Sequence, residues 1–245
     1  MASLDEVCEG ISEIVPLLKR YKNRLDADDF VHDRMSGNGP VVDNLINNLS
    51  RQFPEAGRIY WSVRGWSLLV WQPVYVTILA ANIWNTHIEL ASMGQRVRGT
   101  IVAGFYLPEH DITIGYASDP LHSGAQTIND FVTKIYDKYG VLLGIRRKLA
   151  FSIASDIMLD ALMTAGYAGS MELMVQLPDL GQKWLHAAKL KTRARLVHKQ
   201  GNNSLHIEPA RNACCQAFRC SGGQLCESCP RRKKIDMKQK YPLLF

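Results

Sequence analysis

Five of the six cysteines of this 245-residue chain lie close together near its C-terminal end. They read Cys214-Cys215-x(10)-Cys226-x(2)-Cys229, with Cys220 inside the ten-residue gap, and the first 213 residues hold one other cysteine. Disulfides in proteins of oxidising compartments usually connect distant loops, which thiols this close together cannot do. The pattern therefore favours a metal site.

Two kinds of metal centre suit four thiolates at this spacing. Structural zinc sites usually take each ligand pair from a C-x(2–4)-C turn. Cys214 and Cys215 make an awkward pair for zinc, because the side chains of adjacent residues tend to diverge. Iron–sulfur clusters accept more varied spacing, since their ligands reach two irons bridged by sulfide. The spacing favours a [2Fe–2S] cluster, with zinc second and a metal-free structural role third.

The run from Arg211 to Pro230 resembles the C-terminal signature of the FhuF-type siderophore-iron reductases. The resemblance implies that a [2Fe–2S] cluster is the cofactor and that Cys220, which has no place in the pattern, is not a ligand. The implied metal ligands are Cys214, Cys215, Cys226 and Cys229.

The same resemblance implies an oxidoreductase that reduces a cytoplasmic ferric siderophore of the hydroxamate type by one electron and releases Fe(II). Its implied partners are the ferric siderophore and a cytoplasmic electron donor of the ferredoxin or flavin-reductase type. By the same resemblance, the body over residues 1–200 would form the siderophore-binding surface, but the sequence does not assign its pocket residues.

The charge of the chain is concentrated around the cysteines. The net charge is +6, but residues 1–182 hold 15 Lys and Arg against 20 Asp and Glu, whereas residues 183–245 hold 14 against 3. A basic surface attracts acidic partners. Arg231 and Arg232 follow Pro230, the residue after the last cysteine, and are candidate substrate-binding residues. For the tail beyond them, a peripheral membrane contact is left open, and no nucleic-acid partner is expected.

Two alternative functions follow from the same residues. If the four thiolates hold zinc, the basic surroundings indicate a nucleic-acid-binding or interaction module. If they hold a cluster without turning over a siderophore, the protein is an electron carrier or a redox sensor. Signatures such as G-x-S-x-G, G-x-x-x-x-G-K-[ST], G-x-G-x-x-G and H-E-x-x-H are absent from the sequence, which leaves the cysteine site as the main candidate for chemistry.

The hydrophobic periodicity predicts an α+β fold with a mostly helical body, a small antiparallel sheet and a C-terminal Fe–S segment. Helices are expected over 41–53, within 59–84 with a break at Pro73, over 128–139 and over 145–161. Residues 95–106 and 111–116 are expected to form a hairpin. The predicted division is a siderophore-binding body over 1–200 and a cluster-binding segment with a basic tail over 201–245.

The apolar stretch from Ser67 to Trp84 approaches transmembrane length, but Gln72, Pro73 and Asn82 interrupt it, so a buried core helix is expected. The first ten residues lack the basic and apolar regions of a secretory signal, which predicts a cytoplasmic protein. Asp156 and Asp160 lie one helical turn apart, and their spacing predicts no more than a polar helix face.

Overall fold

The computed structural model describes residues 2–22, 26, 28–32, 35–108, 119–200 and 205–232. Its helices are α1 (Leu4–Ile14), α2 (Gly39–Gln52), α3 (Gly57–Ile83), α4 (Pro120–Leu143), α5 (Arg147–Ala168) and α6 (Met171–Ala187). Its strands are β1 (Arg20–Tyr21), β2 (Phe30–Val31), β3 (Gly94–Arg98), β4 (Ile101–Tyr106), β5 (Arg195–Gln200) and β6 (Leu205–Ala210). Short 3₁₀ turns are η1 (Met35–Gly37), η2 (Pro54–Ala56) and η4 (Ala217–Arg219).

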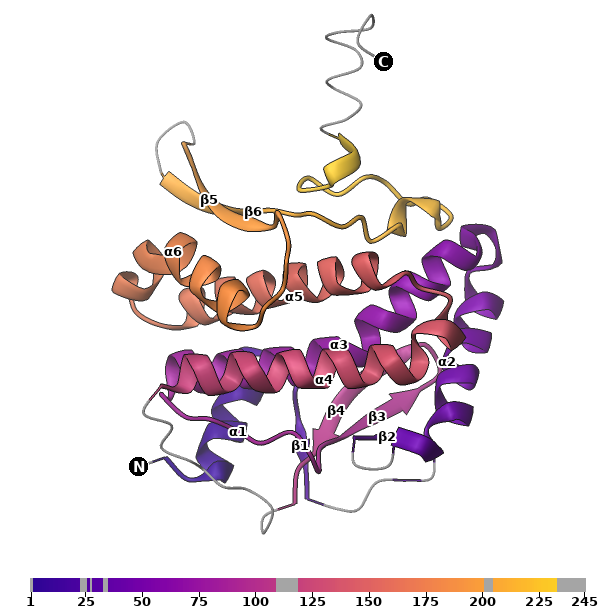
Figure 1. The fold of residues 1–245 in the computed structure, drawn as a ribbon, viewed down its shortest axis with the longest axis horizontal. Helices are drawn as coiled ribbons and strands as arrows, with labels where there is room; N and C mark the ends of the chain where they lie inside the picture. Colours follow the sequence, from indigo (N-terminus) through magenta and orange to yellow (C-terminus); the bar gives the residue numbers. More distant parts are fainter. Residues whose placement is uncertain are drawn as a thin grey trace, which may run out of the picture.

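These elements confirm the predicted α+β fold with a mostly helical body. The small sheet has the order β1-β4-β3-β2, and its pairings are antiparallel except for the parallel pairing of β1 with β4. A separate hairpin pairs β5 with β6. Figure 1 shows α4 and α5 between the four-stranded sheet on one side and the β5–β6 hairpin with the C-terminal segment on the other.

Helix α3 forms the centre of the core and packs against α2, α4 and α5. Trp66 and Leu69 are fully buried on it, and the Trp66 indole N–H donates to the carbonyl of Ala150 on α5 at 2.7 Å. By length and composition, residues 54–83 and α5 could each cross a membrane, but two thirds of each apolar window is buried in the protein. The expectation of a buried core helix is confirmed.

The expected break at Pro73 was wrong, because α3 continues through it. A proline inside a helix lacks an N–H and leaves the carbonyl four residues earlier, here that of Leu69, without its helical donor. The side-chain amide of Gln95 on β3 donates to this carbonyl at 2.8 Å. Gln95 is fully buried, and Gln72 and His32 contact its amide group as well. A tertiary hydrogen bond thus replaces the helical one.

The predicted hairpin was wrong in its first strand. The run 95–106 is not one strand but most of a hairpin, in which β3 and β4 join at a turn containing Gly99, whose φ is +61°. Glycine adopts this left-handed conformation at little cost. The expected second strand, 111–116, lies outside the described residues.

The division at residue 200 stays a prediction. The expected boundary near Gly201 lies outside the described residues, and the strands on either side of it pair with each other from Arg195 opposite Ala210 to Gln200 opposite Leu205. β5 packs against α6, and β6 packs against α5. The hairpin therefore leads the chain from the helical body to the cysteine segment.

Candidate metal centre

The cysteine segment is a compact run of turns that follows β6. Cys214 and Cys229 are buried, with 9% and 2% of their surfaces exposed, whereas Cys215 and Cys226 are exposed. The Sγ atoms of Cys214 and Cys229 lie 3.8 Å apart. Two thiolates bound tetrahedrally to one metal at about 2.3 Å would lie about 3.8 Å apart, so this pair is spaced as ligands of a single ion.

The four thiols are close in the chain but are not gathered at one point. Among the described residues, no group of three or more His, Cys, Asp or Glu side chains is placed to hold a metal ion. Cys226 interacts with Cys229, and Cys229 with Cys214. The structure therefore brings together part of the predicted ligand set, and the full set of Cys214, Cys215, Cys226 and Cys229 stays a prediction.

The ten-residue gap between the cysteine pairs closes into a tight loop. Gln216, directly after Cys215, has a left-handed backbone with φ of +62°, which turns the chain into η4. The N–H of Gly223 donates to the carbonyl of Cys220 at 2.8 Å. A Cβ at Gly223 would lie 2.3 Å from the carbonyl oxygen of Ala217, so this close backbone approach requires glycine. The loop returns the chain to the first cysteine pair.

Backbone N–H groups point at the buried thiols. The N–H of Gln216 donates to Cys214, although burial still raises the pKa of that thiol to about 11. Burial also acts to raise the pKa of Cys229, but the N–H groups of Arg231 and Arg232 and the neighbouring thiols outweigh it, and the pKa of Cys229 is lower than usual. Because the thiolate is the metal-binding form, these donors favour ligation at Cys229.

One face of α5 holds the residues that precede the first cysteine. Asp156 accepts hydrogen bonds from the backbone N–H groups of Asn212 at 3.0 Å and Ala213 at 2.9 Å. Asp160, one turn further, accepts from the Arg211 guanidinium at 2.7 Å, and Ser152, one turn earlier, accepts from the Asn212 amide at 3.2 Å. Burial raises the pKa of Asp156 to about 6.

The role of this face is the main feature that sequence reasoning missed. The spacing of Asp156 and Asp160 placed them on one side of a helix, as the structure confirms. The groups that this side contacts belong to residues more than fifty positions further along the sequence. The carboxylates serve as acceptors that position the cysteine segment, and the pairing of two acids one turn apart was the available signal.

A second set of contacts joins the ten-residue loop to η2 and to the start of α3. The N–H of Ser221 donates to the Glu55 carboxylate on η2 at 2.8 Å. Tyr60, near the start of α3, forms a hydrogen bond with Cys220, and burial is the main reason why the pKa of Tyr60 rises to about 12. Cys220 thus has a partner on the body, and its exclusion from the ligand set stays a prediction.

The two arginines after the last cysteine have partners within the segment. The Arg231 guanidinium lies 4.9 Å from the centre of the Phe218 ring, and Arg232 donates to the carbonyl of Leu225 at 2.8 Å. Both contacts fasten the Cys-x(2)-Cys turn to the loop. The assignment of these arginines as substrate-binding residues stays a prediction. Lys233, Lys234, Lys238 and Lys240 lie outside the described residues.

The cysteine segment is similar to a known iron–sulfur domain. Residues 211–231 match the family model of the FhuF 2Fe-2S C-terminal domain. The matched residues contain Cys214, Cys215, Cys226 and Cys229, so the C-terminal segment is consistent with an FhuF-type family. The match favours [2Fe–2S] over zinc as the cofactor. The donor set fits this cofactor, since all four candidate side chains are free thiols and two of them are spaced for one metal.

Proposed function

We propose that this protein is a cytoplasmic ferric-siderophore reductase. The observation that carries the proposal is the match of residues 211–231 to the FhuF 2Fe-2S domain, on a segment that hydrogen bonds dock onto a helical body. When bound, the [2Fe–2S] cluster supplies a one-electron couple. One electron comes from a donor of the ferredoxin or flavin-reductase class, and one leaves to the Fe(III) of the chelate, which becomes Fe(II).

The chemistry needs no acid, base or nucleophile from the protein. Siderophore oxygens are hard ligands that hold Fe(III) far better than Fe(II), so the added electron loosens the iron. The protein must hold the chelate close to the cysteine segment and set the reduction potential of the cluster. N–H donors to Cys214 and Cys229 and the nearby arginines stabilise negative charge, which raises the reduction potential of a bound cluster.

The test is a single-turnover experiment under anaerobic conditions. The purified protein is reduced with dithionite, excess reductant is removed, and a ferric hydroxamate is added while visible and EPR spectra are recorded. A ferrous-iron chelator measures Fe(II) in the same sample. We expect reoxidation of the cluster with one Fe(II) released per cluster.

Other results separate the alternatives. A cluster that reduces with dithionite but stays reduced in the presence of ferric chelates would identify an electron carrier or a redox sensor. A colourless protein with one equivalent of zinc would overturn both the cofactor and the reductase.

A further inference from the structure

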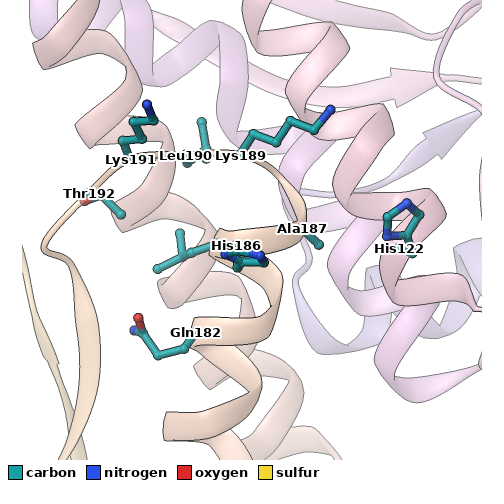
Figure 2. Close-up of a pocket in the computed structure, with 9 residues that line it drawn as sticks. His122, Gln182, His186, Ala187, Lys189, Leu190, Lys191 and Thr192 are labelled. Carbon is teal, nitrogen blue, oxygen red and sulfur yellow. The ribbon is translucent and has the colours of Figure 1, made fainter.

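The first turn of α4, the C-terminal end of α6 and the loop after α6 line an open cavity of about 590 Å³. This volume lies within the range of small-molecule sites. The lining residues are His122, Gln182, Leu185, His186, Ala187, Lys189, Leu190, Lys191 and Thr192. Figure 2 shows His122 on the helix that faces the end of α6 and the loop carrying the two lysines. None of these residues takes part in the contacts described above for the metal centre.

The lining of the cavity carries charge of one sign. Lys189 and Lys191 are exposed cations, and His122 and His186 come from the two facing elements. Among the described residues that line the cavity there is no Asp or Glu. Leu185 and Leu190 are buried beneath this polar rim. A cavity with an apolar floor and a cationic rim is suited to an anionic ligand of moderate size.

Lys189 occupies a position where glycine is the usual residue. Its backbone is left-handed, with φ of +53°. The N–H of Lys189 bonds to the carbonyl of His186 at 3.0 Å, and that of Leu190 to the carbonyl of Leu185 at 3.1 Å. This is the Schellman arrangement that ends a helix, in which the left-handed residue is most often glycine. A lysine here is strained relative to glycine, and such strain is typical of functional positions.

The cavity borders the segment that carries the cysteines. The hydroxyl of Thr192, on the cavity wall, accepts a hydrogen bond from the Asn212 amide at 3.4 Å. Asn212 lies two residues before Cys214, which is at most about 7 Å along an extended chain. A ligand in the cavity would therefore lie on the same side of the helical body as the candidate cluster.

We propose that this cavity binds the substrate of the proposed reductase, and that the substrate is a ferric chelate with net negative charge. The proposal rests on the proposed function. It refines the expected hydroxamate type to hydroxamates that also carry carboxylates, with catecholates as the other anionic class. A neutral trihydroxamate would gain nothing from Lys189 and Lys191, whereas each free carboxylate can pair with an ammonium group.

Gallium chelates test the site without any redox step, because Ga(III) complexes copy the ferric ones and cannot be reduced by the protein. Calorimetry on the cluster-loaded protein compares the Ga(III) complex of a citrate-bearing dihydroxamate with that of a neutral cyclic trihydroxamate. We expect the anionic complex to bind at least tenfold more tightly. Equal affinities, or citrate alone binding as tightly as the anionic complex, would overturn the proposal.

Variants at the strained lysine separate binding from folding. Lys189→Gly removes the charge and suits the left-handed backbone, so we expect a higher Tm and an affinity for the anionic complex lowered at least fivefold. Lys189→Gln combined with Lys191→Gln should lower that affinity tenfold or more and leave the neutral complex unaffected. Lys138→Gln, an exposed position near the opposite end of α4, is the control. A Lys189→Gly protein that is more stable and binds normally would overturn the proposal.

The two proposals can fail separately. Tight binding of the anionic gallium complex without reduction of its ferric counterpart would leave the site standing and refute the reductase. Reduction of ferric chelates with a KM unchanged in the double glutamine variant would leave the reductase standing and refute the site.

Discussion

The carboxylate of Asp156 on α5 accepts a hydrogen bond of 2.9 Å from the backbone N–H of Ala213, the residue directly before Cys214. Its other oxygen accepts from Asn212 at 3.0 Å. Two adjacent N–H groups are thus satisfied by a single side chain on the helical body. This arrangement fixes where the cysteine segment starts.

Asp156→Asn is expected to loosen this attachment, because one oxygen becomes an amide nitrogen that faces an N–H donor. An unsatisfied buried N–H costs about 1–3 kcal/mol. We expect a lower Tm and fewer irons per chain after purification. Asp179→Asn, at an exposed position on α6, should change neither quantity. Full iron content in Asp156→Asn would show that the segment holds its cysteines in place without α5.

Cys226→Ser is expected to abolish the visible absorption of the cluster and the single-turnover reduction, because serine replaces a predicted ligand. Cys220→Ser should preserve both, since a serine hydroxyl can still bond to Tyr60. Iron analysis and visible spectra of the two variants make the comparison. Loss of the cluster in Cys220→Ser would show that the ligand set is wrong.

Gly223→Ala is expected to reduce cluster content, since its methyl group would lie 2.3 Å from the carbonyl oxygen of Ala217 and force the ten-residue loop open. Gly222→Ala is a matched neighbour: its φ of +71° makes alanine unfavourable, but a Cβ there meets no atom within 4 Å. Iron per chain should therefore fall more in Gly223→Ala. An equal loss in both would attribute the effect to backbone strain alone.

Gln95→Leu is expected to destabilise the fold by about 1–3 kcal/mol, because the Leu69 carbonyl loses its donor next to Pro73. Pro73→Ala restores an N–H to the helix. The double variant should therefore be less destabilised than the sum of the two single changes. Denaturant unfolding of the four proteins forms the cycle, and strict additivity would mean that Gln95 does not compensate for Pro73.

The stability of the fold should depend on pH through His32. Burial lowers the pKa of His32 to about 3, whereas an unfolded histidine titrates near 6.5. The unfolded chain therefore binds the extra proton first as pH falls. The contribution of neutral His32 to the free energy of unfolding is therefore complete above about pH 6.5, and it is lost progressively as the pH falls to about 3.

The corresponding measurement compares wild type with His32→Asn in denaturant unfolding at pH 7 and pH 5. Between pH 7 and pH 5, the free energy of unfolding of the wild type should fall by about 2 kcal/mol more than that of the variant. Parallel losses in the two proteins would show that His32 is accessible to protons in the folded state.

The order of the cysteines along the chain was enough to predict a [2Fe–2S] segment, because ligand identity and spacing are local properties that a sequence displays directly. The long helices could be predicted for the same reason, since burial of one face imposes a repeat of 3.6 residues. The boundaries of β3 and β4 could not, because a run of β-forming residues contains a turn at Gly99 whose position depends on pairing with other strands.

Tertiary structure alone decided which long-range partners complete each local feature. Pro73 was expected to break α3, and a glutamine from β3 satisfies the carbonyl that the proline leaves free. Asp156 and Asp160 looked like a polar surface, and they hold the residues before Cys214. The cationic cavity joins α4 to the end of α6 across some sixty residues of chain. Hydrogen bonds and charge act through space, so a repeat or a spacing shows which groups a helix presents but not which distant groups the fold places against them.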